Sequence, residues 1–245
     1  MRVSGEIIEI DYDHTRGFFE RRSERFDGDN PYAVTMYQNN NRKLVESRNK
    51  KEVEKLLPMI QLDSESRVLD IACGIGRWAD AIECDIDEYC GIDFSPKLIQ
   101  IARERNRKDN FHFFDGDIGA ITQILSDSAM DKFDRVLLMG ILVYLNDRDI
   151  QDLFDEVEPN LKEHTIICIR EPIAVEHRLT LKDFFSEDLE DYYNAIYRTR
   201  DELQVIFGDS LVKQGFTLVA DGVLFDEQDL NNRKETIQYY FTFER

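Results

Sequence analysis

A regular alternation of strand-like and helix-like segments between residues 67 and 169 is the feature that most constrains the fold. Five apolar runs are typical of buried strands, at residues 67–72, 89–93, 110–114, 133–139 and 164–169. Segments with helical patterns lie between them, at residues 76–84, from Pro96 onward, at 118–125 and at 150–161. Strands that alternate with helices form a parallel sheet covered on both faces. The sequence therefore predicts an α/β protein.

The segments on either side of this alternation have different patterns. Before it, residues 15–28 and 42–58 look helical, and residues 30–41 read as a loop. After the polar, aromatic stretch 176–199 come a helix at 200–213 and two strand-like runs, 216–225 and 236–244, with no helix between them. Two such runs favour an antiparallel hairpin at the sheet edge. We therefore expect one domain with a seven-stranded, mostly parallel sheet.

The charge of the chain limits its partners. Lys and Arg number 31 and Asp and Glu number 50, which gives a formal net charge of −19. A chain this acidic is repelled by polyphosphate backbones and anionic lipid surfaces, so we expect no nucleic acid and no membrane partner. No apolar run approaches the roughly 20 residues needed to span a bilayer, and the N-terminus lacks a signal-peptide pattern. The four cysteines form no metal-binding spacing, so we expect no metal, reduced thiols and a cytoplasmic protein.

The first strand leads into a glycine-containing turn that can hold a ligand. Residues 68–78 read VLDIACGIGRW, with Asp70 inside the strand and Gly74 and Gly76 after it. Glycine is needed where a ligand lies against the backbone, and the helix N-terminus beyond offers free N–H groups to an anion. Asp93 ends the second strand, where an acidic side chain can accept both ribose hydroxyls of a nucleoside.

Two nucleoside ligands fit this turn. The run from Gly74 to Ala79 matches the G-x-G-x-x-G/A pattern of dinucleotide sites, which is weak alone because short glycine patterns are common. Asp70 decides against a dinucleotide, because a carboxylate four residues before the first glycine suits a ligand with a cationic amino group. S-adenosylmethionine carries such an amino group.

Four segments together resemble the class I S-adenosylmethionine-dependent methyltransferases. They are VLDIACGIGRWA (68–79), GIDFSP (91–96), FFDGDI (113–118) and FDRVLLMGILVYLND (133–147). The resemblance implies a Rossmann-like fold, S-adenosylmethionine as cofactor and S-adenosylhomocysteine as product. It divides the single domain, 1–245, into an N-terminal helical lid (1–60), a cofactor-binding core (61–170) and a substrate-side segment with the C-terminal hairpin (171–245). Ala72 departs from the family pattern, which has glycine there, and we expect only tighter packing.

The resemblance implies cofactor contacts along the first four strands. Eleven positions are involved: Tyr37, Arg48, Asp70, Ala72, Cys73, Gly74, Asp93, Phe94, Asp117, Ile118 and Met139. Asp70 and the backbone of Cys73 and Gly74 would lie along the methionine part. Asp93 would hold the ribose and Phe94 the adenine. Asp117 would accept from the adenine amine with Ile118 on the ring face, unless Asp117 is a turn residue and Asp115 takes its role.

Three of these eleven positions would face the reacting end of the cofactor. The resemblance places Met139 at the sulfonium. Tyr37 would cover the sulfonium, and Arg48 would pair with the methionine carboxylate. The alternative is that Tyr37 is an ordinary loop residue and Arg48 an ordinary surface residue.

The acceptor site is expected where the fifth strand ends in Arg170-Glu171-Pro172. In open α/β sheets the ligand crevice lies beyond the carboxyl ends of the strands, so we expect Arg170 and Glu171 to point into it. Arginines and tyrosines cluster in the stretch that follows, and guanidinium forks suit phosphoryl oxygens. The predicted acceptor residues are Arg170, Glu171, Tyr197 and Arg198. The alternatives are a surface helix with scattered salt bridges and an Arg170 that only pairs with Glu171.

Further motifs are similar to small-molecule methyltransferases from bacterial surface-polysaccharide gene sets. They include FFERRS, AVTMYQNNN and REP followed by RLTLKDFFSEDL. Within that group they resemble the enzymes proposed to O-methylate the phosphoramidate of Campylobacter capsules. The resemblance implies a role in capsule biosynthesis and a phosphoryl acceptor, which needs no general base. A sugar hydroxyl or amine acceptor, an NAD(P)-dependent oxidoreductase and a non-catalytic nucleoside-binding subunit stay open, as does the oligomeric state.

Overall fold

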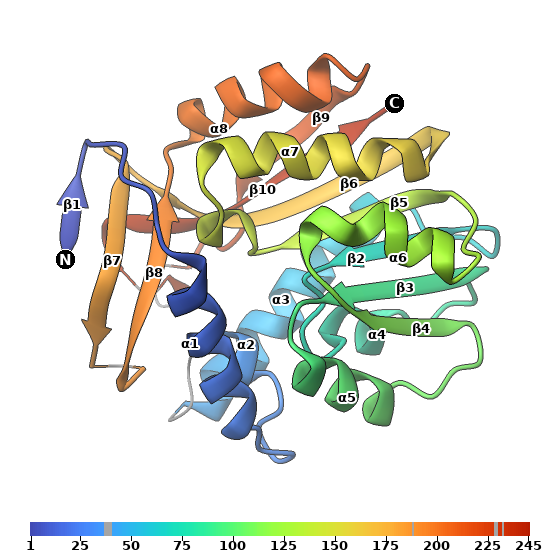
Figure 1. The fold of residues 1–245 in the computed structure, drawn as a ribbon, viewed down its shortest axis with the longest axis horizontal. Helices are drawn as coiled ribbons and strands as arrows, with labels where there is room; N and C mark the ends of the chain where they lie inside the picture. The colour runs from blue at the N-terminus through green and yellow to red at the C-terminus, as the bar shows by residue number, and fades with distance from the viewer. Residues whose placement is uncertain (37–40, 188, 228–229, 232) are drawn as a thin grey trace.

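The main sheet has seven strands in the order β4-β3-β2-β5-β6-β10-β9 (Figure 1). The computed structural model describes residues 1–36, 41–187, 189–227, 230–231 and 233–245. In chain order the strands of this sheet are β2 (Arg67–Ile71), β3 (Glu88–Asp93), β4 (Phe111–Asp115), β5 (Phe133–Met139), β6 (Leu161–Ala174), β9 (Thr217–Val223) and β10 (Thr236–Glu244). The strands β2 to β6 pair in parallel, and β10 is antiparallel to both β6 and β9. The predicted Rossmann-like fold with an antiparallel C-terminal pair is confirmed.

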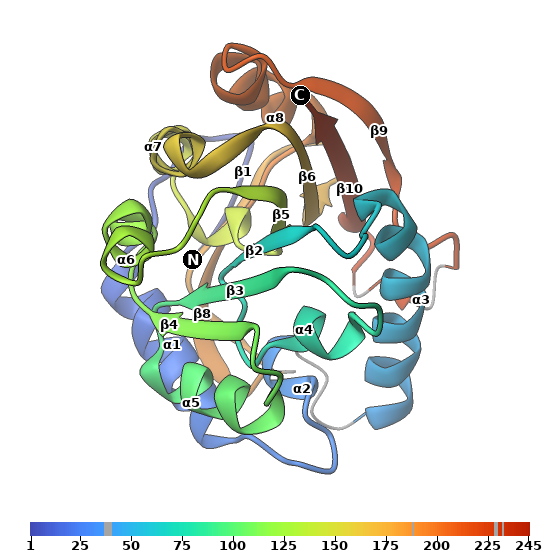
Figure 2. The same ribbon diagram turned by 90° about the vertical axis from the view of Figure 1, so that its right-hand side faces the viewer.

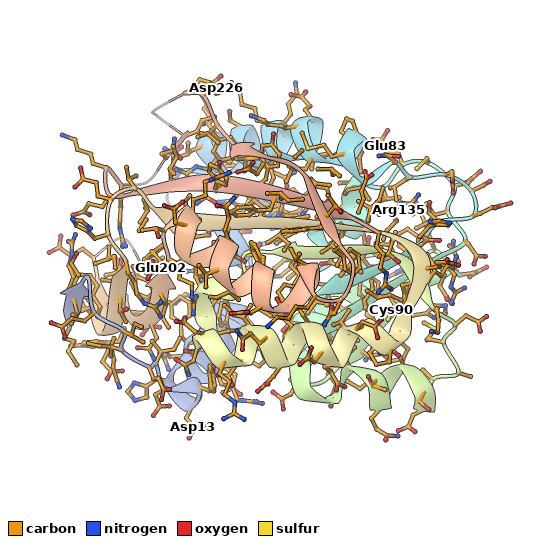
Figure 3. All side chains as sticks on the ribbon, turned by 90° about the horizontal axis from the view of Figure 1, so that it is seen from above. Asp13, Glu83, Cys90, Arg135, Glu202 and Asp226 are labelled. Atoms are coloured by element: carbon orange, nitrogen blue, oxygen red, sulfur yellow. The ribbon has the colours of Figure 1, made fainter. Side chains whose placement is uncertain are left out.

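Helices cover both faces of this sheet. One face carries α6 (Ile121–Asp127), α7 (Asp147–Val157) and α8 (Arg200–Phe207), and the other carries α3 (Arg42–Ile60), α4 (Arg77–Ala81) and α5 (Pro96–Arg105). Figure 2 shows α7 on one side of the main sheet and α3 on the other. Side chains alternate across β2, so that Leu69 and Ile71 pack on the first face while Val68 packs on the second. Figure 3 shows α8, which carries Glu202, beside α7. Because helices cover both faces, the carboxyl ends of the strands form the open edge of the main sheet.

A second, smaller sheet was not predicted. It consists of β1 (Arg2–Ser4), β7 (Leu179–Ser186) and β8 (Asp191–Tyr197), all antiparallel, in the order β1-β7-β8. The sequence indicated only a polar, aromatic connection at residues 176–199, with a surface helix as the alternative. Alternate side chains of the two longer strands are apolar and pack together with Phe18 in a separate core. An apolar residue at every second position is typical of half-buried strands, and this explains why the stretch forms two strands instead of the predicted connection.

The N-terminal segment crosses the open edge of the main sheet. Helix α1 (Tyr12–Glu24) has Asp11 as its N-cap residue, whose side chain accepts hydrogen bonds from the amides of Asp13 and His14. It lies between the small sheet and the ends of the main strands (Figure 1). A short helix, α2 (Ala33–Met36), falls inside the stretch expected to be a loop. Among the described residues, no helix is both long and apolar enough to cross a membrane.

Candidate active site

Two cavities lie beyond the carboxyl ends of the strands and share part of their walls. The large cavity has a volume of about 500 Å³ and is bordered by the glycine turn, the end of β3 and α1. The small cavity has a volume of about 120 Å³ and is bordered by α3, β6 and β8. Residues that line both are Thr35, Met139, Gly140 and Tyr144. We call these four residues the neck.

Three alternate residues of the turn after β2 have left-handed backbone. The φ angles are +60° at Ala72, +56° at Gly74 and +74° at Gly76. A Cβ added at Gly74 would lie 2.9 Å from Cγ2 of Thr35, so the close approach of α2 excludes a side chain there. Ala72 was expected to change only packing. The structure adds a backbone reason for glycine, because a left-handed conformation costs an L-residue roughly 1–2 kcal/mol.

Asp93 ends β3 with its carboxylate fixed at the wall of the large cavity. Its Oδ2 accepts from the amide of Gly74 at 3.0 Å, and its Oδ1 accepts from the amide of Ser95 at 2.9 Å. Burial raises the pKa of Asp93 to about 6, against the lowering effect of these two hydrogen bonds. Each carboxylate oxygen has a further lone pair, so this group can accept from two hydroxyls of a ligand.

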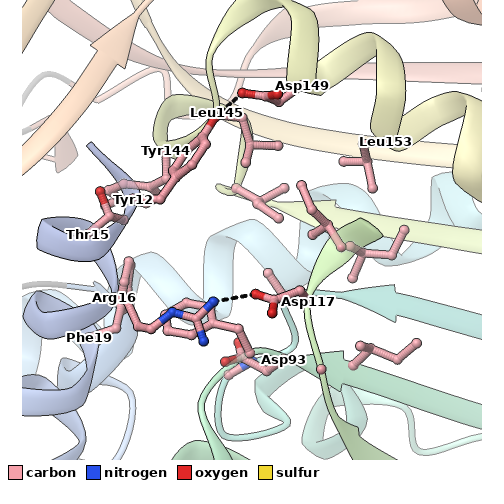
Figure 4. Close-up of a pocket in the computed structure, with 18 of the residues that line it drawn as sticks. Tyr12, Thr15, Arg16, Phe19, Asp93, Asp117, Tyr144, Leu145, Asp149 and Leu153 are labelled. Atoms are coloured by element: carbon pink, nitrogen blue, oxygen red, sulfur yellow. Dashed lines mark hydrogen bonds and ion pairs between the residues drawn. The ribbon is translucent and has the colours of Figure 1, made fainter. Parts of the chain in front are cut away.

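Helix α1 places a cation and an aromatic ring over the same wall. Nη2 of Arg16 lies 2.5 Å from Oδ1 of Asp117, and the guanidinium lies 5.2 Å from the ring centre of Phe94 (Figure 4). Phe19 meets Phe94 edge to face, with ring centres 5.8 Å apart. Ile118 lines the cavity next to Asp117. Sequence reasoning missed Arg16, although its spacing of three from Phe19 places both on one side of a helix.

Asp70 lies beneath the glycine turn rather than on the cavity wall. Its Oδ2 accepts a hydrogen bond from the hydroxyl of Tyr89, and its buried Oδ1 has no hydrogen-bond partner among the described residues. Burial raises the pKa of Asp70 to about 7. Sγ of Cys73 points away toward β3, because a Cβ added at Gly91 would lie 2.8 Å from it. The side chain of Cys73 is therefore directed away from a ligand, and this residue lines neither cavity.

The small cavity is rich in arginine and tyrosine. Arg170 enters from β6, with Nε 3.3 Å from Oε2 of Glu52 on α3. Arg233 donates from Nη2 to the hydroxyl of Tyr193 at 2.6 Å and from Nη1 to that of Tyr197 at 3.5 Å. Sequence reasoning selected Arg170 and Tyr197 for this site and missed Arg233 and Glu52. A single charged residue in a loop or on a helix face gives no sequence signal for such convergence.

Two predicted acceptor residues do not reach either cavity. Glu171 follows Arg170 on a strand, so it points to the opposite face, where its oxygens accept from the amides of Leu142 at 2.8 Å and Val143 at 3.3 Å. Burial raises the pKa of Glu171 to about 7. Arg198 is also buried, donating to Oδ1 of Asp147 at 2.7 Å and to the carbonyl oxygen of Leu142 at 2.8 Å. Both residues hold the turn after β5 instead of facing a ligand.

The remaining predicted positions are divided between the cavities. Met139 ends β5 at the neck. Arg48 lines the small cavity and, among the described residues, not the large one. Tyr37 lies outside the described residues. Within the part of the chain that the structure describes, no three His, Cys, Asp or Glu side chains form a group that could hold a metal ion.

The central part of the chain is similar to known protein sequences. Residues 68–164 match the model of a methyltransferase domain family. The magnesium-protoporphyrin O-methyltransferase of Rhodobacter capsulatus is 28% identical over 156 residues, which are 60% of this chain and 64% of that protein. The 23S rRNA (uracil(1939)-C(5))-methyltransferase of Shewanella denitrificans is 31% identical over 98 residues. That match covers 37% of this chain, which spans about 20% of the length of that relative.

Solved structures agree on the fold. The phosphoethanolamine N-methyltransferase 1 of Haemonchus contortus, in complex with phosphoethanolamine and S-adenosylhomocysteine, superposes with a TM-score of 0.68 at 17% identity. The match covers 95% of this chain and 48% of that one. The fold is thus that of the class I methyltransferases. Strands β3 to β5, together with β2 from Val68 onward, lie within the residues that match the methyltransferase domain family.

Proposed function

We propose that this protein is an S-adenosylmethionine-dependent methyltransferase that acts on a small anionic acceptor. The observation that carries the proposal is the junction of the two cavities. The large cavity has the carboxylates and apolar walls of a nucleoside site, and the small cavity has arginines. The two meet at the neck, so a methyl donor in one would face an acceptor in the other.

The large cavity fits the cofactor in size and in chemistry. About 500 Å³ lies within the usual range of roughly 300–1,000 Å³ for small-molecule sites. Asp93 would accept from the ribose hydroxyls, and Asp117 from the adenine amine. Phe94 and Ile118 would pack on the ring. Asp70 lines neither cavity, so its buried carboxylate would support the turn from beneath rather than contact the cofactor.

The chain's own residues would align the reactants and exclude water at the neck. Bound S-adenosylmethionine supplies an electrophilic methyl group on a positively charged sulfur. Met139 and Tyr144 border the transfer point, and Arg170 would hold the acceptor atom against it. Alignment of this kind can contribute several kcal/mol to the rate. Glu171 faces the other way, and an anionic oxygen needs no base to remove a proton.

The shape of the small cavity supports a small acceptor. At about 120 Å³ it is far below the size of a site for a porphyrin. The net charge of −19 opposes binding of an rRNA. The same fold in the H. contortus enzyme is solved with phosphoethanolamine, a phosphorylated small molecule. The narrower prediction is O-methylation of a capsular phosphoramidate in the cytoplasm, and a phosphoramidate is an acceptor of this class.

Ligand-induced thermal stabilisation followed by a transfer assay tests the proposal. We expect S-adenosylhomocysteine, but not NAD or NADP, to raise the melting temperature, because only a ligand that binds the folded state stabilises it. Radiolabelled S-adenosylmethionine is then offered with phosphorylated, carboxylate and neutral acceptors of matched size. Stabilisation by NAD(P) alone would contradict the cofactor. Transfer only to neutral sugars or amines would contradict the acceptor class.

A further inference from the structure

Arg48 is a buried cation whose charge is not balanced within the described residues. Its side chain comes from α3 into the small cavity and the residue is 5% exposed. Nε donates to the carbonyl oxygen of Leu230 at 2.8 Å, and no described carboxylate forms an ion pair with the guanidinium. Burying a charge without a partner is costly. A bound anion would remove that cost.

Arg170, which lines the same cavity, shares its carboxylate partner with another arginine. Glu52 lies between Arg170, at 3.3 Å, and Arg77, which donates from Nη2 to Oε1 at 2.5 Å. All three side chains are largely buried. One negative charge therefore serves two guanidiniums, and Arg48 adds a third cation beside them. Burial and the repulsion from Arg170 lower the pKa of Arg48 to about 10.

The position of Arg170 connects this positive charge to the neck. A Cβ added at Gly140 would lie 2.7 Å from Nη1 of Arg170, so the guanidinium reaches the residue at which the two cavities meet. On the far side, Tyr193 and Tyr197 line the same cavity, and their hydroxyls accept hydrogen bonds from Arg233. A ligand held by Arg170 would therefore have one oxygen at the neck and the others among arginine and tyrosine donors.

We infer that the small cavity binds a doubly charged tetrahedral oxyanion, as in a phosphate monoester or a phosphonate, between Arg48 and Arg170. The inference rests on the proposed function and names its substrate class. A dianion balances the arginines better than a carboxylate or a phosphodiester, each of which carries one charge. Guanidinium forks bind phosphoryl oxygens through paired, charge-assisted hydrogen bonds. Arg48 is thereby the residue that selects for the second negative charge.

This charge requirement has a consequence for the reaction. A lone pair of the phosphoryl oxygen forms the new O–CH3 bond, and the electron pair of the broken S–CH3 bond stays on sulfur. The sulfonium becomes a neutral thioether, the phosphoryl group loses one negative charge, and no proton moves. The methyl ester is a monoanion, which the arginines bind less well. Methylation itself therefore weakens binding and favours product release.

Calorimetry with two phosphate esters tests the inference without any methyl transfer. Methyl phosphate is a dianion at pH 8, because the second pKa of a phosphate monoester is about 6, whereas dimethyl phosphate is a monoanion. With S-adenosylhomocysteine present, we expect the wild-type protein to bind methyl phosphate at least tenfold more tightly. Arg48→Gln should reduce that preference to threefold or less, and Arg48→Lys should give an intermediate value.

Two further variants keep the test decisive. Arg148→Gln removes an arginine whose side chain is 88% exposed on α7, and we expect it to leave the preference unchanged. If Arg48→Gln does not fold, Arg170→Lys provides the test. It keeps the charge but loses the fork of the guanidinium, so it should weaken the binding of methyl phosphate at least threefold. Equal affinity of the wild-type protein for both esters, with S-adenosylhomocysteine still bound, would overturn the inference and leave the proposed function standing. Loss of S-adenosylhomocysteine binding would instead overturn the proposed function.

Discussion

Replacing Asp93 by alanine separates its contribution to cofactor binding from its contribution to the fold. In the proposed complex the carboxylate accepts from the ribose, and hydrogen bonds to a charged group contribute roughly 1.5–3 kcal/mol. We therefore expect Asp93→Ala to weaken S-adenosylhomocysteine by about 10- to 150-fold. Isothermal titration calorimetry at pH 8 measures the change directly.

The same substitution has two opposing effects on stability. The amides of Gly74 and Ser95 lose their acceptor, which costs about 1–3 kcal/mol for each unsatisfied group. Against this, burial raises the pKa of Asp93 from 3.8 to about 6, so the ionised group costs the folded state about 3 kcal/mol at pH 8. Removing the charge recovers part of the loss, and we expect a folded variant with a lower melting temperature.

A neighbouring carboxylate provides the control. Asp115 is the register partner of Asp93 on β4, but its side chain is about half exposed and does not line the large cavity. Asp115→Ala should leave S-adenosylhomocysteine affinity within twofold of wild type. If folded Asp93→Ala also keeps wild-type affinity, the ribose assignment is wrong.

Three other substitutions test separate parts of the site. Burial raises the pKa of Asp70 above its unfolded value to about 7, so the cost of its charge to stability grows as pH rises from about 4 to 7. Asp70→Asn should therefore raise the ligand-free melting temperature at pH 8 but not at pH 4. Ala72→Gly should stabilise the protein by about 0.5–1 kcal/mol in urea titrations, because it relieves left-handed strain but adds unfolded-state entropy. Arg198→Met should lower stability by about 1–3 kcal/mol, because two buried carbonyl oxygens lose a donor while Asp147 keeps its hydrogen bonds from Arg178. Methyl phosphate affinity per folded molecule should stay unchanged. A folded Arg198→Met with wild-type stability and weaker methyl phosphate would return Arg198 to the acceptor site.

Local patterns were sufficient for the central part of the fold. Apolar runs and the helices between them predicted the succession of strands β2 to β6 along the chain and their parallel pairing, because a parallel sheet requires a crossover connection after each strand. The same patterns placed Asp93 and Met139 at the carboxyl ends of strands, where a cavity forms. The β9–β10 pair was also predicted, since no helix separates the two runs.

One error could have been avoided from the sequence. Arg170 and Glu171 are neighbours on a strand, so they cannot both point into one crevice. The actual partner of Arg170 is Glu52, which lies far away in the sequence on α3. A helix-face glutamate gives no local sign that it will pair with a strand-end arginine, so only the tertiary structure decides that contact.

What the sequence determined by itself is the succession of strands and helices along the chain and the strand ends at which a nucleoside can bind, because both follow from short-range patterns. What only the tertiary structure decided is which distant segments close that edge. Arg16 on α1 forms an ion pair with Asp117, and Arg48 and Arg170 line the same cavity, which β8 completes. These contacts depend on how the N-terminal helix and the small sheet pack against the main sheet. That packing arises from burial of apolar surface, which is not directional, so the apolar pattern of one element does not specify which distant element will cover it.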